Sequence, residues 1–219
     1  MRFFTIGEFV RMKTILLVAL CFALYSCESI ADKPVSELET NVQKVVNHCL
    51  TCHSTREMQR GPLLEGLEEW YLDESIDRFR DGHRGTHPKD VQGLLMYSAI
   101  KDIPEEDIQL ALEWFAGQKR PEIKAYVKGD IDKGKVLYKE RCYGCHEHTM
   151  GKFFSRSPDL YKLEDWYLLS QLRAFKKGWR GSETEDNHGA SMKVAVDDMN
   201  DQDFKDVTAY LATFQQKPE

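Results

Sequence analysis

The sequence predicts an all-α protein of two tandem domains, each a small bundle of short helices. Two observations predict this architecture: a set of short motifs recurs at a constant spacing, and apolar residues recur at helical spacing within each copy. No sustained alternation of apolar and polar residues indicates a sheet. With 219 residues, 42% of them hydrophobic, the chain is long enough for two small domains, each with a modest core.

The repeat consists of matched motifs whose positions all differ by 96 residues. They are WYL at 70–72 and 166–168, FxxG at 79–82 and 175–178, RG at 84–85 and 180–181, and single Gly and Met residues at 93 and 189 and at 96 and 192. A constant offset over so many motifs indicates a tandem duplication. Between the copies, Pro and Gly interrupt a polar stretch, which is typical of a linker. We therefore expect a first domain over residues 41–120, a linker over 121–130 and a second domain over 131–219.

Apolar side chains within each copy fall on single helical faces. These faces are Val42, Val45, Val46 and Cys49; Ile108, Leu112 and Phe115; and Phe204, Val207, Leu211 and Phe214. Asn200, followed three residues later by Asp203, predicts the start of the last helix, and Pro104 followed by acidic residues predicts the matching start in the first copy. Each face is expected to pack into a core.

The first 27 residues resemble a bacterial export signal. An apolar run at 14–24 follows two basic residues and is too short to span a bilayer. It ends in LYSC at 24–27, similar to the motif that precedes an acylated cysteine, so residues 1–27 are expected to be a signal peptide with Cys27 as the lipidated N-terminus. The alternative is an ordinary cleavage after Ala31. Residues 28–40 would then form a polar tether, and the protein would be periplasmic and held at the membrane by its lipid.

Two C-x-x-C-H motifs, at 49–53 and 142–146, carry the chemistry. Cysteines three residues apart lie on one face of a turn or helix, so both can form thioethers to one haem while the following His reaches the iron. The motifs therefore predict two covalent haems c. The expected attachment residues are Cys49, Cys52, Cys142 and Cys145, and the expected iron ligands are His53 and His146.

Two other readings of these motifs are less consistent with the spacing. Zinc ribbons separate their two Cys pairs by roughly 15 to 20 residues, whereas the two pairs here lie about 90 residues apart. A zinc site also leaves the His after each pair unexplained. A thioredoxin-like redox pair would accompany a βαβ pattern, which the sequence lacks. Haem attachment explains both motifs together.

With these motifs, the chain resembles the class I cytochromes c, and more closely the two-domain dihaem cytochrome c4 family. The segment GPLLEG at 61–66 is similar to the family motif G-P-x-L-x-G, whose Pro carbonyl receives the Nδ1–H of the ligand His. The resemblance implies this role for Pro62. The second copy departs from the motif and keeps only Pro158 and Leu160. By the same resemblance, Pro158 is expected to serve His146.

A second family motif, Y-L with F-x-x-G-x-R further on, is present in both copies. It aligns Tyr71 and Arg84 in the first copy with Tyr167 and Arg180 in the second. The resemblance implies that these four residues support the haems. It also implies a packed domain pair whose haem propionates lie near each other, so that electrons can pass between the haems.

The sixth iron ligand could be Met, His or absent. Met96 and Met192 share one register in the two copies and stand where the family carries its axial Met, so we favour them. His87 and His188 are the rivals, because neutral imidazole also binds iron. Neither His recurs in the other copy, and either could replace the Met of its own domain.

The expected function is one-electron transfer rather than catalysis, because iron held by His and Met has no open position for a substrate. The expected partners are redox proteins, a respiratory donor and a terminal oxidase or reductase, and the alternative is a subunit permanently docked on a membrane dehydrogenase or oxidase. A dihaem peroxidase would need an open haem. The formal charge of −6 makes nucleic acid a poor partner.

Overall fold

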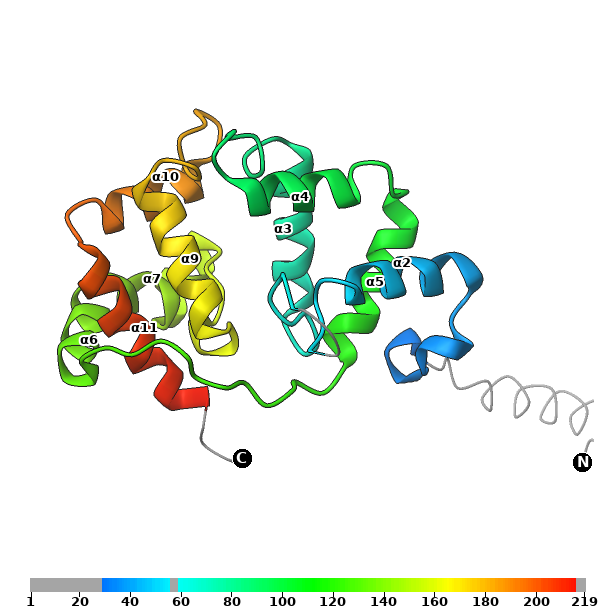
Figure 1. The fold of residues 1–219 in the computed structure, drawn as a ribbon, viewed down its shortest axis with the longest axis horizontal. Helices are drawn as coiled ribbons and strands as arrows, with labels where there is room; N and C mark the ends of the chain where they lie inside the picture. Colours follow the sequence, from blue (N-terminus) through cyan, green and yellow to red (C-terminus); the bar gives the residue numbers. More distant parts are fainter. Residues whose placement is uncertain (1–28, 56–58, 216–219) are drawn as a thin grey trace, which may run out of the picture.

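The structure is a computed structural model that describes residues 29–55 and 59–215. Within these ranges the chain is helical and contains no strand, which confirms the predicted fold class. Two helical units lie side by side, joined by an extended segment that runs along one edge (Figure 1). None of the described helices is long and apolar enough to cross a membrane.

The described part of the first domain contains four α-helices. They are α2 (Thr40–Leu50), α3 (Glu69–Arg80), α4 (Val91–Ile100) and α5 (Glu105–Gly117). Helix α5 packs against α2 and α3, and α4 packs against α3. The core therefore lies between the first and last helices of the domain.

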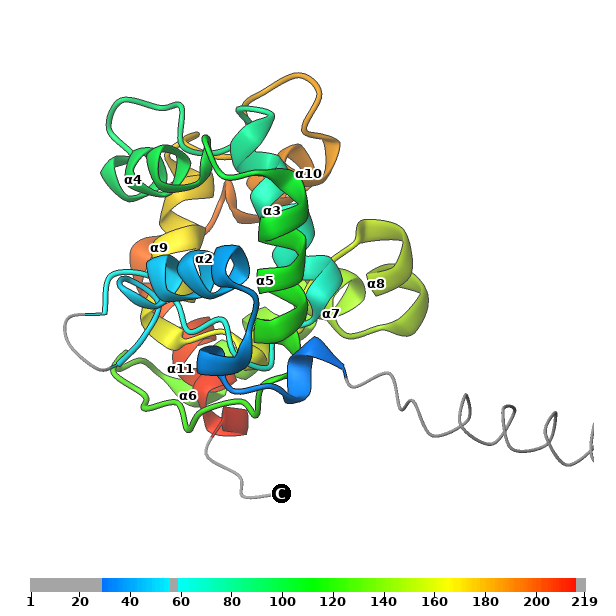
Figure 2. The ribbon, with the colours of Figure 1, turned by 90° about the vertical axis from the view of Figure 1, so that its right-hand side faces the viewer.

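The second domain repeats this arrangement with insertions. Its elements are α6 (Ile131–Leu137), the π-helical turn η3 (Tyr138–Cys142), α7 (Tyr143–His146), α8 (Thr149–Ser155), the 3-10 turn η4 (Leu160–Lys162), α9 (Asp165–Lys176), α10 (Asn187–Val196) and α11 (Asp201–Gln215). Helix α11 packs against α6 and α9, as α5 packs against α2 and α3. Helices α9, α10 and α11 each begin 96 residues after α3, α4 and α5, so the duplication predicted from the sequence is a duplication of structure. Helix α8 projects from the side of this domain (Figure 2).

The apolar faces predicted from the sequence form the cores. Ile108 and Phe115 are buried in the first domain, and Phe204 and Leu211 are buried in the second. Phe214 differs from the prediction, because 40% of it is exposed. It packs edge-on against Tyr210 near the end of the last helix, where the core has ended.

The predicted start of the last helix has the expected hydrogen bonds. The side chain of Asn200 accepts from the backbone N–H of Asp203 at 3.1 Å, and the carboxylate of Asp203 accepts from the N–H of Asn200 at 2.9 Å. Such a reciprocal pair satisfies donors that the first turn leaves free. The matching helix α5 begins after Pro104 with three acidic residues in its first turn, which suits the positive end of the helix dipole.

The segment before α2 lies against the first domain. It forms two 3-10 turns, η1 (Ile30–Asp32) and η2 (Val35–Glu37). The indole N–H of Trp114 donates to the carbonyl of Lys33 at 2.8 Å, and Gln118 donates to the carbonyl of Ala31 at 2.8 Å. Turn η1 packs against α5 and turn η2 against α2, so the expected tether lies on the first domain. The expected signal peptide and Cys27 lie outside the described residues.

The connection between the domains is held by two buried carboxylates of the second domain. Asp165 accepts from the backbone N–H groups of Tyr126 and Val127 at 2.5 and 2.6 Å. Asp206 accepts from the N–H of Asp130 at 2.9 Å. These bonds satisfy backbone donors that the extended segment leaves without helical partners, so the linker is fixed to the second domain.

Candidate functional site

The first C-x-x-C-H motif forms a turn at the end of α2. The backbone N–H of His53 donates to the carbonyl of Cys49 at 2.9 Å, and His53 is buried. Its Nδ1–H donates to the carbonyl of Pro62 at 2.6 Å. This bond fixes the ring and leaves Nε2 as the atom that can bind a metal. The contact expected between His53 and Pro62 is therefore present.

The loop that carries Pro62 passes very close to the His53 ring. A Cβ atom placed on Gly61 would lie 2.4 Å from Cε1 of His53, which is far inside van der Waals contact. Only glycine fits at this position without moving the ring. The first G of GPLLEG thus serves the placement of the ligand His.

The second motif is built differently but reaches a similar geometry. Cys142 ends the π-helical turn η3, and His146 ends α7. The Nδ1–H of His146 donates to the carbonyl of Pro158 at 3.2 Å. Helix α8 occupies the chain between His146 and Pro158, and this longer connection accounts for the three extra residues of the second copy.

The protonation states of these residues fit metal and thioether chemistry better than dithiol redox chemistry. Burial raises the pKa of Cys49 and of Cys142 to about 12, whereas dithiol catalysts use a lowered thiol pKa. Burial also lowers the pKa values of His53 and His146. Both imidazoles are therefore held neutral, the form that binds iron.

A pocket in the second domain brings together most of the site residues predicted for that domain. Its walls include Cys142, His146, Pro158, Met192, Tyr167 and Arg180. The first domain contributes to the same pocket through Trp70, Tyr71 and Glu74. The site of the second domain is therefore completed by side chains of the first.

The two predicted Met ligands occupy equivalent places on equivalent helices. Met96 lies on α4 and Met192 on α10, and both are partly buried against the core. His188 lines the same pocket as Met192, so it stays a rival ligand there. His87 instead stacks on Trp179 of the second domain, with ring centroids 5.7 Å apart.

Each of these helices starts with the same cap and the same close crossing. The N-cap residues Asp90 and Asp186 accept from the backbone N–H of the residue three positions later, at 3.0 and 2.8 Å. Gly85 has a φ of 74°, and a Cβ on it would lie 2.4 Å from the carbonyl oxygen of Gly93. The repeated RG and G motifs therefore let one loop cross the start of the Met-bearing helix.

Two tyrosines and two arginines meet where the domains touch. Arg84 donates to the hydroxyl of Tyr167 and to Gln171 of the opposite domain, both at 3.2 Å. Arg180 donates to the same Gln171 oxygen at 2.6 Å. Burial and the nearby charge of Arg84 lower the pKa of Arg180 to about 9. The duplicated family motif thus places two cations at one interface.

This pair of guanidinium groups fits two bound haems. Among the described residues, neither Arg84 nor Arg180 forms an ion pair with a carboxylate. Buried charges are normally paired, so the cluster calls for anionic groups from another source. Each haem carries two propionates, which have the charge and hydrogen-bonding capacity that the arginines need.

Comparison with known families decides the identity of this arrangement. The cytochrome c family matches residues 131–215. The second domain is a cytochrome c domain. Because the first domain repeats its helices and its C-x-x-C-H motif, the chain has two covalent haem c sites.

Solved structures show the same fold over most of the chain. Cytochrome c4 from Acidithiobacillus ferrooxidans superposes with a TM-score of 0.59 at 22% identity, covering 76% of this chain and 98% of that one. Reduced recombinant cytochrome c4 from Pseudomonas stutzeri gives a TM-score of 0.53 at 22% identity, covering 78% and 95%. The likeness therefore extends to the arrangement of two cytochrome c domains.

A thiosulfate dehydrogenase from Marichromatium purpuratum shares the fold as well. It has a TM-score of 0.59 and 23% identity, and the match covers 82% of this chain and 40% of that one. The chain thus spans less than half of the length of that enzyme. No curated protein matches the chain.

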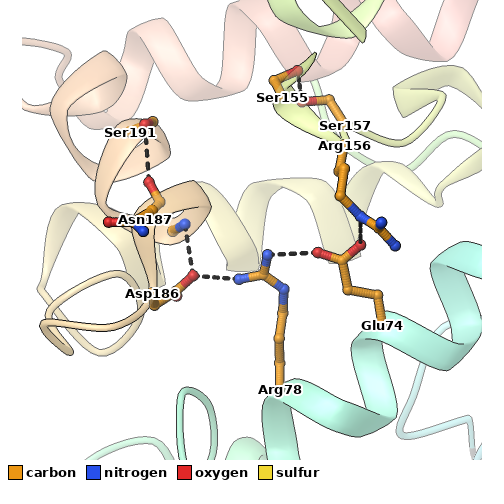
Figure 3. Close-up of polar contacts among 9 residues, drawn as sticks. Glu74, Arg78, Ser155, Arg156, Ser157, Asp186, Asn187 and Ser191 are labelled. Carbon is orange, nitrogen blue, oxygen red and sulfur yellow. Dashed lines mark hydrogen bonds and ion pairs between the residues drawn. The ribbon is translucent and has the colours of Figure 1, made fainter. Parts of the chain in front are cut away.

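A charged network across the domain interface was not predicted from the sequence (Figure 3). Arg78 of α3 donates to Glu74 at 2.8 Å and forms an ion pair with Asp186, and Arg156 donates to Glu74 at 2.8 Å. The helix caps Asp90 and Asp186 are 96 residues apart, so comparison of the two copies could have identified both of them. Arg78 aligns with Ala174, and no repeat signal marked it.

Proposed function

We propose that this dihaem cytochrome carries single electrons between a respiratory donor and a terminal oxidase or reductase. The observation that supports this best is the shared pocket, in which first-domain side chains line the haem site of the second domain. One of these side chains, Tyr71, belongs to the motif expected to support the first haem, so a group of the first domain reaches the second haem site. Such packing suits passage of an electron between the two haems. A bound haem c supplies a one-electron couple.

The chain's own residues would tune and shield that couple. His53 and His146 are held by backbone carbonyls in one orientation, and the burial around them keeps water away. Met96 and Met192 are the proposed opposite ligands, and thioether ligation raises the potential of a c-type haem. With both iron positions filled, the sites would exchange electrons without binding a substrate.

A second candidate is a subunit docked permanently on a larger redox enzyme. The likeness to a thiosulfate dehydrogenase, over 40% of that chain's length, favours it, because the same fold there belongs to a longer enzyme. Co-purification after mild solubilisation distinguishes the two candidates. A mobile carrier purifies alone, whereas a docked subunit brings its partner with it.

We also propose that the protein is periplasmic and held at the membrane through a lipid on Cys27. The basic residues and apolar run before Cys27 support export, and covalent haem attachment suits the same compartment. A lipid tether would keep a carrier near membrane-bound donors and acceptors. This location also suits the docked alternative.

A spectroelectrochemical titration of the purified protein tests the electron-carrier proposal. We expect two one-electron waves at high potential and no binding of CO by the reduced protein. An open haem that binds CO would instead support peroxidase-type chemistry. A protein that lacks two haems would contradict the proposal altogether.

A further inference from the structure

Glu164 belongs to the second domain but supports the ligand loop of the first. It lies directly before α9, and only 4% of it is exposed. Its carboxylate accepts from the backbone N–H of Leu63 at 2.6 Å and from the side chain of Gln59 at 2.8 and 2.9 Å. The indole N–H of Trp166 donates to it at 3.1 Å. Every one of these groups is a donor, as an ionised carboxylate requires.

One peptide group connects Glu164 to the iron ligand His53. The peptide between Pro62 and Leu63 accepts the Nδ1–H of His53 at its carbonyl, at 2.6 Å. The same peptide donates its N–H to Glu164, also at 2.6 Å. A carboxylate on the N–H side polarises an amide and makes its carbonyl a stronger acceptor, because hydrogen bonds in a chain strengthen one another. The carboxylate thereby acts on the imidazole through the peptide.

We infer that Glu164 is a positioning residue for the first haem, acting from the opposite domain through the Pro62–Leu63 peptide. A stronger bond at Nδ1 increases the basicity of the His53 ring. A more basic axial ligand stabilises the oxidised iron, so Glu164 lowers the potential of the first haem. This inference depends on the proposed electron-transfer function, in which that potential matters.

The second haem site has no matching contact. The residue aligned with Glu164 is Glu68. Its carboxylate instead accepts a hydrogen bond from the side-chain ammonium of Lys162 at 2.6 Å. Among the described residues, the N–H of Asp159, which aligns with Leu63, donates to no carboxylate. The bond from His146 to Pro158 is 3.2 Å, longer than the bond from His53 to Pro62. The two haems thus receive unequal support although their domains are duplicates.

Arg120 holds the same loop from the other side. Its guanidinium donates to the carbonyls of Leu63 and Glu65 at 2.9 and 2.8 Å, and to the backbone carbonyl of Lys162 in the second domain at 2.6 Å. Its positive charge lies close enough to interact with Glu164. The charge of Glu164 is therefore partly offset by Arg120, and Glu164 acts on His53 both through the hydrogen bond to Leu63 and through its direct electrostatic interaction with the ring.

Two substitutions test this in the full haem-loaded chain. Glu164→Gln keeps the size of the side chain but replaces the charged acceptor with a weaker neutral one. Glu164→Asp keeps the charge but shortens the side chain and stretches the contact. Both should shift one of the two redox waves to higher potential. In the reduced protein, the proton NMR signal of His53 Nδ1–H should move upfield, while the signal of His146 stays in place.

The matched control is Glu68→Gln, which removes one charge from the same interface without touching the Pro62–Leu63 peptide. It should leave the first haem's wave and the His53 signal unchanged. A haem assay on the wild type and on each variant comes first: a wild-type protein without two haems contradicts the proposed function, whereas a variant without two haems is only a failure of that variant. If Glu164→Gln does not bind both haems, the inference is tested with Glu164→Asp. The inference is overturned if loaded variants leave the His53 signal and both waves in place, or if Glu68→Gln moves the first haem's wave equally.

Discussion

Arg78 of the first domain forms an ion pair with Asp186, the residue that caps the helix carrying Met192. Asp186 is buried, with 5% exposure, and its second bond goes to the backbone N–H of Gly189. Arg78 therefore links the body of one domain to the start of the other domain's ligand helix. The aligned cap of the first domain is Asp90, and the residue aligned with Arg78 is Ala174. An alanine cannot form the matching ion pair.

Arg78→Ala should lower the free energy of unfolding by about 1–3 kcal/mol, because it leaves a buried carboxylate without its ionic partner. Chemical denaturation monitored by far-UV circular dichroism measures the change. Arg173→Ala is the control, since its pair with Asp201 is exposed at 39% and 51% and should contribute less than about 1 kcal/mol. If both variants lose the same free energy of unfolding, the ion pair at the interface stabilises the protein no more than an exposed pair does.

Met96→Ala and Met192→Ala should each remove about half of the iron–sulfur charge-transfer band of the oxidised protein. Each should also lower the potential of one haem, because thioether ligation raises it. Absorption spectroscopy and redox titration measure both effects. His87→Ala and His188→Ala serve as controls and should keep the band. If a His variant loses the band and the Met variants keep it, the Met assignment is wrong.

Replacement of Cys49 and Cys52 by Ser should remove one covalent haem and leave the other attached. The reason is that each C-x-x-C-H motif holds its own haem through two thioethers. Intact mass and a pyridine haemochrome assay count the haems. The matched variant with Cys142 and Cys145 replaced should lose the other haem. Two haems in either variant, or bound zinc in the wild type, would contradict the assignment.

Cys27→Ser should prevent lipidation and release the protein from the membrane fraction. The physical reason is that the apolar run before Cys27 is too short to span a bilayer, so the acyl chains would supply the attachment. Fractionation and mass spectrometry of the N-terminus test this. A soluble wild-type protein that begins at Asp32 would support the ordinary cleavage after Ala31 instead.

Local sequence patterns predicted the helical fold class, the duplication and the attachment motifs, but not helix α8 or the π-helical turn η3. Helical spacing placed Ile108 and Phe115 in a core, and both are buried. Helical spacing also predicted that Phe214 lies on a buried face. Phe214 is instead partly exposed, because it lies near the end of the last helix, beyond the core. The short segment before α2 was expected to be a tether because it is polar. The side chains of Trp114 and Gln118, at the end of α5, instead donate hydrogen bonds to its carbonyls.

The sequence by itself determined which residues can attach haem, because that chemistry needs two Cys and a His within five positions. The tertiary structure decided which residues tune the two sites. Glu164 and Leu63 are 101 residues apart, and Arg78 and Asp186 are 108 apart. No local periodicity connects such partners, and the repeat predicts only what the two copies share. Their contacts exist because two duplicated domains pack against each other, and that packing makes the two sites different.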